Sequence, residues 1–343
     1  MQRGTDGSVC QRRRDSDALP NQILLLVTKL FLGKIMISRD QFLKKHINKN
    51  DLGVEISPWF RPLASRLDGY NSVCLDIFDR DTLVKNAEEI NCGEFTENIP
   101  EIDLIGSATE LEYLFREKYV DDLARYVVSA HNLEHLPNPI AFFKSADNIL
   151  MDGGYLSLVL PDKRFCFDYF RPLSTTGDFL RAFIEGARQP SPWQIFEQKS
   201  LGAAFWVNQS QFVFGRKMSD DPAAVHPTGN LEFEFSELMR RLTSDSEHYE
   251  DTHCWTFTPS SFELILNDIN QVCLTKLKVD EIKSFEEGEF VAHLRKTENI
   301  LSSEEFINRR KKLLSDIISE CAMSEPLYWA ANQMRTGFEP STV

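Results

Sequence analysis

The chain has 343 residues, of which 42% are hydrophobic, and its formal net charge at pH 7 is -14. This hydrophobic content permits a sizeable core and argues against wholesale disorder. The acidic balance argues against a nucleic-acid-binding surface, which needs basic side chains to neutralise phosphates, so we expect a small or neutral ligand.

The first 50 residues are basic, whereas the remainder is acidic. An apolar run at residues 23–37 is interrupted by Lys29 and Lys34, is too short to span a bilayer, and precedes no small-residue cleavage site. We therefore expect residues 1–50 to form a poorly ordered extension, with Met36 as an alternative natural start and no stable membrane insertion. The seven cysteines include no C-x-x-C pair, which favours a reducing cytoplasm over a disulfide framework.

From residue 51 onward, short β-favouring runs alternate with helical ones. We expect strands at residues 53–57, 72–77, 101–106, 125–130 and 155–162. A helix from Pro139 to about residue 150 lies between the last two strands, and Gly153 and Gly154 are read as its C-terminal signal. Strands separated by helices imply right-handed crossovers, so we predict that residues 51–162 form a doubly wound α/β sheet that is mostly parallel.

The alternation lapses after Asp162. Residues 163–252 are rich in aromatic side chains and mostly helical candidates, so we expect a largely helical insertion that supplies a substrate pocket or lid. Residues 253–298 complete the sheet with a helix starting at Pro259 after the N-cap Thr258, and then two late antiparallel strands. Residues 299–343 contain a surface helix with a capping box at Ser302 or Ser303, followed by a tail.

The string from His131 to His135 matches H-x-x-E-H, the signature of inverted zinc peptidases. In that motif two histidines on one helix hold the metal and the glutamate acts as general base. Here the residues before His131 are strand-like, and Pro137 and Pro139 follow closely, so one rigid helix cannot carry both imidazoles. We predict a strand, a tight turn and a new helix near Pro139, with no metal site.

The stretch VVSAHNLEHLPNPIAFFKSADNILMDGGYLSLVLPD resembles the fourth strand, fourth helix and fifth strand of class I S-adenosylmethionine-dependent methyltransferases of the type 11 kind. The stretches PDKRFCFDYFRPLS and DTHCWTFTPSSFELI are similar to a subgroup associated with glycosyltransferases and polysaccharide synthesis. The resemblance covers roughly residues 50 to 298. It implies a Rossmann-like fold, S-adenosylmethionine as cofactor, and O-methylation of a sugar or glycan precursor.

The resemblance also implies cofactor contacts at the carboxyl ends of the first four strands. The expected contact residues are Glu55, Ser57, Asp76, Gly106, Ser107, Ser129, Ala130 and His131. Asp76 would accept hydrogen bonds from both ribose hydroxyls, and we prefer it to Asp79 and Asp81 because it directly ends the apolar run. Ser57 stands where the subgroup usually has glycine, which allows a positive φ and close approach of the ligand.

For catalysis, the resemblance directs attention to His135, Asp162 and His253. A hydroxyl acceptor must lose a proton, and an imidazole with an ordinary pKa of about 6.5 suits that task. The alternative for each residue is a structural hydrogen bond, and Glu134 could simply complement the dipole of the next helix.

Three other functions are alternatives to methyl transfer. The substitution of glycine by Ser57 favours a non-catalytic, methyltransferase-like binding protein in a polysaccharide-assembly complex. A nicotinamide-dependent oxidoreductase is disfavoured because no G-x-G-x-x-G follows the first strand. A zinc peptidase is disfavoured by the two prolines.

Overall fold

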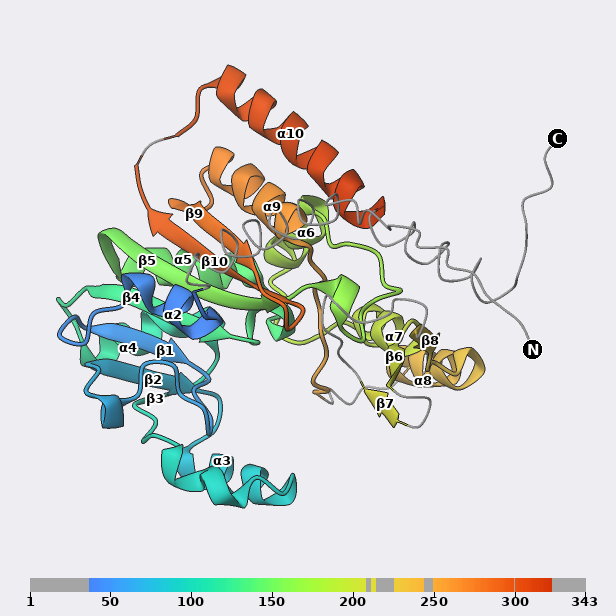
Figure 1. The fold of residues 1–343 in the computed structure, drawn as a ribbon, viewed down its shortest axis with the longest axis horizontal. Coiled ribbons are helices and arrows are strands. Elements are labelled where there is room, and N and C mark those ends of the chain that lie inside the picture. Colours follow the sequence, from blue (N-terminus) through green and yellow to red (C-terminus); the bar gives the residue numbers. More distant parts are fainter. Residues whose placement is uncertain (1–36, 208–210, 214–224, 244–248, 299, 323–343) are drawn as a thin grey trace, which may run out of the picture. The chain divides into compact units, whose positions relative to one another are not determined.

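A seven-stranded sheet organises the chain, in the order β3-β2-β1-β4-β5-β10-β9 (Figure 1). Its parallel strands are β1 (Gly53–Ile56), β2 (Ser72–Asp76), β3 (Leu104–Ile105), β4 (Ala124–Ala130) and β5 (Leu150–Pro161). Strand β10 (Glu289–Lys296) lies antiparallel between β5 and β9 (Leu277–Ser284). The predicted fold class, a mostly parallel doubly wound sheet with a late antiparallel pair, is confirmed.

The computed structural model describes residues 37–207, 211–213, 225–243, 249–298 and 300–322. The chain divides into two units, residues 1–38 and 39–343, and every element named here belongs to the second. Within the described residues, no helix combines the length and the apolar character needed to cross a bilayer. The six cysteines in this part of the chain are free.

Helices form three of the four connections between the parallel strands: α3 (Arg80–Glu89), α4 (Leu111–Lys118) and α5 (Pro139–Ile149). The connection from β1 to β2 differs from the expected pattern, because it contains only the 3-10 turn Arg66–Asp68. Pro58 and Pro62 lack backbone N–H donors, and Gly69 has a φ of 85°, so this segment loops rather than forming an α-helix.

Both faces of the sheet are buried. On β4, Tyr126 and Val128 point into one apolar cluster, and Val127 between them points into the other. Helix α2 (Arg39–Leu43) and the 3-10 turn Lys44–His46 cover the first face. Helices α4, α5 and α9 (Pro259–Gln271) cover the second, and α10 (Ser303–Ala322) lies along α9 (Figure 1).

The start of the described chain differs from one expectation. Part of the segment expected to be a poorly ordered extension is folded, because Phe42, Leu43 and Ile47 are buried. The Phe42 ring packs against Phe285, and the backbone carbonyl oxygen of Phe42 lies 3.0 Å from Nε2 of His293 on β10. The apolar side chains of α2 thus complete one face of the sheet; residues 1–36 lie outside the described residues.

The end of α5 also differs from the sequence-based boundary. Strand β5 begins at Leu150, directly after the helix. Gly153, with a φ of 73°, therefore lies inside an irregular part of this strand rather than capping the preceding helix.

The predicted starts of the last two helices are observed. Thr258 precedes Pro259 at the start of α9, and the N–H of Thr258 donates to Ser261 Oγ over 2.9 Å. Ser302 forms the predicted capping box of α10 with Glu305, because each residue's side-chain oxygen accepts from the backbone N–H of the other.

The insertion contains helices, as predicted, together with a small sheet that is not predicted. The helices are α6 (Thr176–Ile184), α7 (Pro192–Ser200) and α8 (Leu231–Thr243). The antiparallel sheet consists of β6 (Ala203–Val207), β7 (Gln211–Val213) and β8 (Val225–Pro227). Short polar and aromatic runs do not show a clear period-2 pattern, which explains why these strands escape sequence analysis. Residues 208–210 and 214–224 of this segment lie outside the described residues.

We predict that Phe42→Ala lowers the free energy of unfolding by about 3 to 5 kcal/mol, because it leaves a cavity between α2 and β10. Phe233→Ala on α8 is the matched control, since Phe233 is 59% exposed, and we expect it to change stability by less than about 0.5 kcal/mol. Urea unfolding measures both variants. Equal effects would mean that α2 does not contribute to the fold.

Candidate functional site

The register of the sheet brings predicted residues from three strands together at one edge. Ile56, the last residue of β1, is paired with Leu75 on one side and Ser129 on the other. The residues that follow are Ser57, Asp76 and Ala130, so these three lie side by side where the parallel strands end. This carboxyl edge is where ligands bind in open α/β sheets.

Ser57 occupies a backbone conformation that glycine favours. Its φ is 53°, as expected if the position normally requires a residue without a β-carbon. Its N–H donates to Leu75 O over 2.8 Å, and its hydroxyl accepts from Asn132 Nδ2 over 3.2 Å. The turn after β1 is therefore joined to the turn after β4.

The structure separates the three neighbouring aspartates. Asp76 is 5% exposed, and burial raises the pKa of its carboxyl although two backbone N–H groups and the Ser57 hydroxyl oppose the shift. Asp79 instead caps α3 by accepting from Thr82 N–H over 2.9 Å. Asp81 is exposed in the first turn of that helix. Of the three, Asp76 is the one at the sheet edge.

Gly106 and Ser107 have local structural roles. Gly106 N–H donates to Asp76 O over 2.9 Å, and a β-carbon at this position would lie 2.7 Å from a methyl group of Leu114. Ser107 Oγ lies 2.8 Å from Thr109 Oγ1 and caps the 3-10 turn Ala108–Glu110. Both residues lie next to the edge, but the Ser107 hydroxyl is already engaged.

Glu55 has a different role from the one expected. It is 1% exposed, and its two carboxylate oxygens accept hydrogen bonds from the N–H groups of Leu63 and Ala64. Burial raises the pKa of Glu55 to about 7, although these two bonds oppose the shift. The carboxylate therefore holds the loop after β1, whereas the sequence analysis expected a cofactor contact.

His131 directly follows β4 at the carboxyl edge of the sheet and forms a row of ion pairs with Glu289 and Arg39. Its Nε2 is 2.7 Å from Glu289 of β10, and Glu289 is in turn 2.7 Å from Arg39 of α2. Burial lowers the pKa of His131, but Glu134 and Glu289 outweigh it and raise the value to about 10. Its side chain is 48% exposed.

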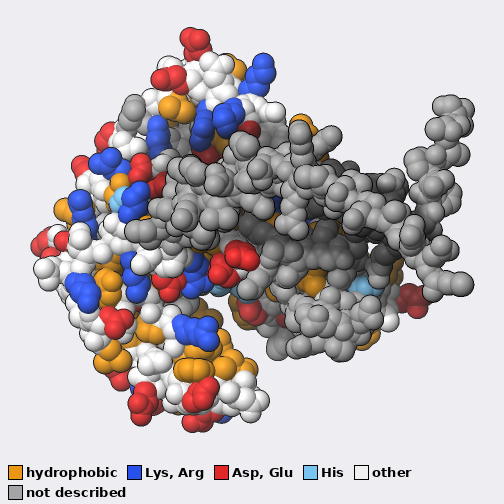
Figure 2. Space-filling model, viewed as in Figure 1, with side chains coloured by type: hydrophobic (Ala, Val, Ile, Leu, Met, Phe, Trp, Pro, Cys, Tyr) orange, Lys and Arg blue, Asp and Glu red, His pale blue; other side chains and the backbone are white. Residues whose placement is uncertain are grey.

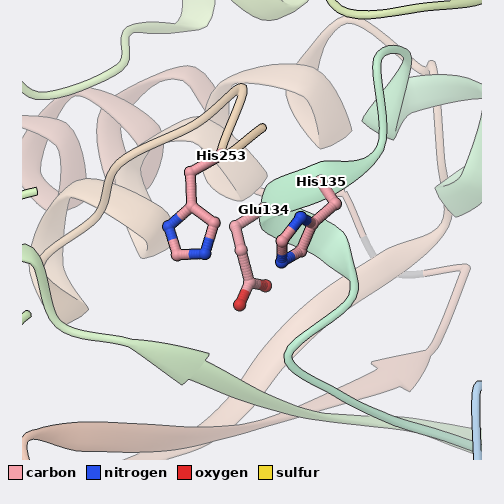
Figure 3. Close-up of side chains that lie close together, drawn as sticks. All are labelled: Glu134, His135 and His253. Carbon is pink, nitrogen blue, oxygen red and sulfur yellow. The ribbon is translucent and has the colours of Figure 1, made fainter. Parts of the chain in front are cut away.

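Glu134, His135 and His253 come together just beyond the end of β4 (Figure 3). Residues Leu133–His135 form a 3-10 turn, and α5 begins only at Pro139, as the sequence predicts. The two imidazole rings meet edge to face, with centroids 4.6 Å apart. Two of the predicted catalytic residues are therefore neighbours, although they are far apart in the sequence.

Backbone contacts fix this meeting point. Glu134 O accepts from Cys254 N–H over 2.7 Å and from Trp255 N–H over 3.2 Å. The indole N–H of Trp255 donates to Leu136 O over 2.6 Å. The segment that returns from the insertion is thus docked on the turn after β4.

Two carboxylates that were not predicted as site residues hold the histidines. Asp251 Oδ1 lies 2.8 Å from Nδ1 of His135, and Asp168 Oδ2 lies 2.6 Å from Nδ1 of His253. Burial lowers the pKa of His135, but the hydrogen bond to Asp251 and the charge of Glu134 raise it overall. The sequence carries no signal for these pairings, because the partners lie in distant segments of irregular spacing.

Asp162 does not join this group. The residue is 1% exposed, and its carboxylate is bound by the Arg164 guanidinium, with Nε 2.9 Å from Oδ1. It also caps the 3-10 turn Lys163–Phe165. The structure thus gives this catalytic candidate a different role, which is to shape the end of β5.

Ser129 of β4, a predicted cofactor contact, is buried, and its hydroxyl has no hydrogen-bond partner among the described residues.

A cavity of about 620 Å³ lies between the insertion and the segment after His253. Its lining includes the aromatic residues Trp193, Phe196 and Trp255. Two further cavities, of about 610 and 530 Å³, are lined by α9 with α10 and by the insertion. The residues lining these three cavities do not include those of the carboxyl edge. Over the described part of the face in Figure 2, acidic and basic side chains are interspersed.

Comparisons with known proteins give matches in structure alone. No family model matches the chain, and no curated protein matches it in sequence. A methyltransferase structure from Methanosarcina mazei matches 74% of this chain and 96% of its own, at 14% identity and a TM-score of 0.36. One from Clostridium acetobutylicum matches 80% and 98%, at 9% identity and 0.38.

A Rhodobacter sphaeroides structure that bears the name Zn-dependent alcohol dehydrogenase matches 75% of this chain and 88% of its own, at 10% identity and a TM-score of 0.39. Proteins with different names thus match at similar, low scores. The fold of this chain therefore rests on its own strand order and pairing, and its function rests on its own residues.

The raised pKa of Glu55 generates a prediction about stability and pH. Because the folded protein holds this proton more tightly than the unfolded chain, the contribution to stability is full below pH 4.5 and is lost as the pH rises through about 7. We expect urea unfolding to show a loss on the order of 2 kcal/mol in the wild type over this range relative to Glu55→Gln. Glu89→Gln, at an exposed position of α3, should keep the wild-type slope. A Glu55→Gln variant with an unchanged slope would contradict the assignment.

Proposed function

We propose that this chain binds S-adenosylmethionine at the carboxyl edge of its sheet and transfers the methyl group to a small acceptor. The observation that carries the proposal is the alignment of Asp76, Ser57 and Ala130 across β2, β1 and β4. An acidic residue beside two small ones suits a nucleoside, because the carboxylate can accept from ribose hydroxyls while the small residues leave room.

Exposed apolar side chains next to Asp76 support the same ligand. Ile77 is 52% exposed, Phe78 41% and Ile105 55%, and all three follow or end the strands β2 and β3. Apolar and aromatic surfaces of this kind can pack against the faces of a purine ring. The edge thus offers an acceptor for ribose beside an apolar surface for the base.

We further propose that the acceptor is a sugar or glycan precursor used in polysaccharide synthesis, and that it is methylated on oxygen. The cavity near Trp193 and Trp255 supports this, since aromatic rings commonly pack against sugar faces. Two of its lining residues, Cys254 and Trp255, directly follow His253 in the chain, and for this reason we consider His253 as a base for an acceptor bound there. The choice of a sugar or glycan as the acceptor rests on the sequence resemblance.

The residues of the chain have limited chemistry to perform in this reaction. Bound S-adenosylmethionine supplies an electrophilic methyl group on a sulfonium. The protein aligns the acceptor with that methyl group, excludes water, and receives the proton that a hydroxyl acceptor releases. His135 and His253 are the candidates for receiving it, and Asp251 and Asp168 would stabilise the imidazolium that forms.

A non-catalytic binding protein is the second candidate. It is favoured by Ser57 in place of glycine and by the lack of an α-helix between β1 and β2. An assay for S-adenosylhomocysteine formation over a glycan library separates the two: product with one acceptor supports the enzyme, and tight cofactor binding without any product supports the binding protein.

We predict that Asp76→Ala weakens S-adenosylmethionine binding by roughly 10-fold or more, because a charge-assisted acceptor of about 1.5 to 3 kcal/mol is lost. Isothermal titration calorimetry measures the effect. Asp81→Ala is the matched control, because Asp81 is exposed in the first turn of α3, and we expect it to change the affinity by less than about 2-fold. Equal losses of affinity in both variants would mean that Asp76 is not the carboxylate that binds the ribose.

Ser57→Gly should preserve or tighten binding of S-adenosylmethionine, within about 3-fold, because glycine adopts the φ of 53° without strain. Ser57→Val provides the contrast, since a β-branched residue resists this conformation, and we expect it to weaken both binding and stability. A loss above about 10-fold in Ser57→Gly would instead show that the hydroxyl makes a specific contact.

A further inference from the structure

Three side chains that could hold a metal ion converge beyond the end of β4. Each of Glu134, His135 and His253 offers one ligand atom, and these atoms lie within 4.8 Å of one another. Figure 3 shows the Glu134 carboxylate between the two rings. Ligands of a tetrahedral zinc ion lie roughly 3.5 Å apart, so small side-chain rotations would close the three groups on an ion.

Each of the two histidines has a carboxylate at one ring nitrogen, as metal-binding histidines typically do. Nδ1 of His135 faces Asp251 and Nδ1 of His253 faces Asp168, at 2.8 and 2.6 Å. A carboxylate at this nitrogen selects the tautomer that carries its proton there, which leaves the lone pair on Nε2. Metal-binding histidines typically donate the N–H of their other ring nitrogen to a carboxylate in this way.

Glu134 supplies an independent indication of a missing partner. It is 0% exposed, and neither of its carboxylate oxygens has a hydrogen-bond partner among the described residues. His131 Nδ1 approaches Oε1 to 3.4 Å, which is an ion-pair distance without hydrogen-bond geometry. This ion pair offsets part of the cost of burying the carboxylate, but it gives neither oxygen a hydrogen bond, and a cation bound to Glu134 would satisfy the oxygens directly.

We propose that Glu134, His135 and His253 form a binding site for a divalent transition-metal ion, of which Zn²⁺ is the representative. Two imidazole nitrogens and one carboxylate oxygen suit Zn²⁺ and related ions better than Mg²⁺ or Ca²⁺, which prefer oxygen alone. Three protein ligands leave one position for water or a substrate oxygen. The proposal does not rest on S-adenosylmethionine binding, and it departs from the sequence-based expectation of no metal. An ion would occupy the Nε2 lone pairs with which His135 and His253 could receive a proton, so each histidine performs one role or the other.

This site differs from the H-x-x-E-H arrangement. In the H-x-x-E-H motif, both histidines, here His131 and His135, would bind the ion from one helix. In this chain, Nε2 of His131 contacts Glu289, and a short 3-10 turn replaces the helix. His253, from a distant segment, takes the second histidine position. Glu134 becomes a ligand rather than a general base. The alternative is a hydrogen-bonded acid-base cluster without metal, which the following experiment distinguishes.

The test is titration of the full-length, chelator-treated protein with Zn²⁺ alone by isothermal titration calorimetry, without S-adenosylmethionine. We expect one strong site in the wild type. His135→Ala and His253→Ala should each weaken it by roughly 100-fold or more, and Glu134→Gln by roughly 10-fold or more. His226→Ala, at an exposed histidine of β8, is the control and should change the affinity by less than about 2-fold. Zn²⁺ should raise the melting temperature of the wild type more than that of Glu134→Gln, and the melting curve without Zn²⁺ shows whether the variant folds.

Two further readouts test the geometry. Asp251→Asn should weaken Zn²⁺ binding less than Asp251→Ala, because asparagine keeps an oxygen for Nδ1–H. Co²⁺ in place of Zn²⁺ should give visible ligand-field bands without thiolate charge-transfer absorption. The proposal is overturned if no strong site exists, if the His135 and His253 variants bind Zn²⁺ like the wild type, or if thiolate bands appear. Loss of Zn²⁺ binding with retained S-adenosylmethionine binding would leave the proposed function standing, and the reverse result would leave the metal site standing.

Discussion

The carbonyl group of Glu134 is the anchor on which the candidate site depends. It accepts hydrogen bonds from two consecutive N–H groups, those of Cys254 and Trp255, and so joins the turn after β4 to a segment that follows the whole insertion. Because the contact is buried and made by backbone, it does not require particular side chains. It sets His253 against His135 and holds Trp255, which lines the aromatic cavity, next to the turn after β4.

Buried charge is concentrated around this anchor. Asp168 and Arg171 are both almost fully buried and lie 2.7 Å apart, and Arg171 also donates to the His253 carbonyl over 2.8 Å. Such groups are expensive to desolvate, and a well-packed apolar set would stabilise the fold equally well. Buried charges next to two histidines and Glu134 are characteristic of a functional site, where the orientation of side chains matters more than stability. By contrast, the carboxyl groups of Glu55 and Asp162 shape loops through hydrogen bonds.

The sequence predicts the sheet well because its strands are buried on both faces and read as continuous apolar runs, as in β4. It also predicts that edge residues such as Ser57 and Asp76 share one end of the sheet. Pairings across long distances could not be predicted: His131 meets Glu289, and His135 meets Asp251, through contacts that only the folded chain creates. The role of Glu55 escapes prediction because burial and loop contacts, not residue type, decide what a carboxylate does. Strand β3 is shorter than its sequence pattern suggests, since it lies at an edge with one partner.

The position of β10 has a consequence for biosynthesis. The surface under α2 includes Val291 of β10, and Arg39 pairs with Glu289 across 250 residues of chain. On the ribosome, β1 to β5 emerge well before β10, so the parallel half of the sheet can assemble while one of its faces is still uncovered. The first helix of the folded unit can meet β5 early, but its contacts with β10 must wait for one of the last strands. During that interval, the apolar side chains of α2 and of the open face are exposed to chaperones and to other nascent chains.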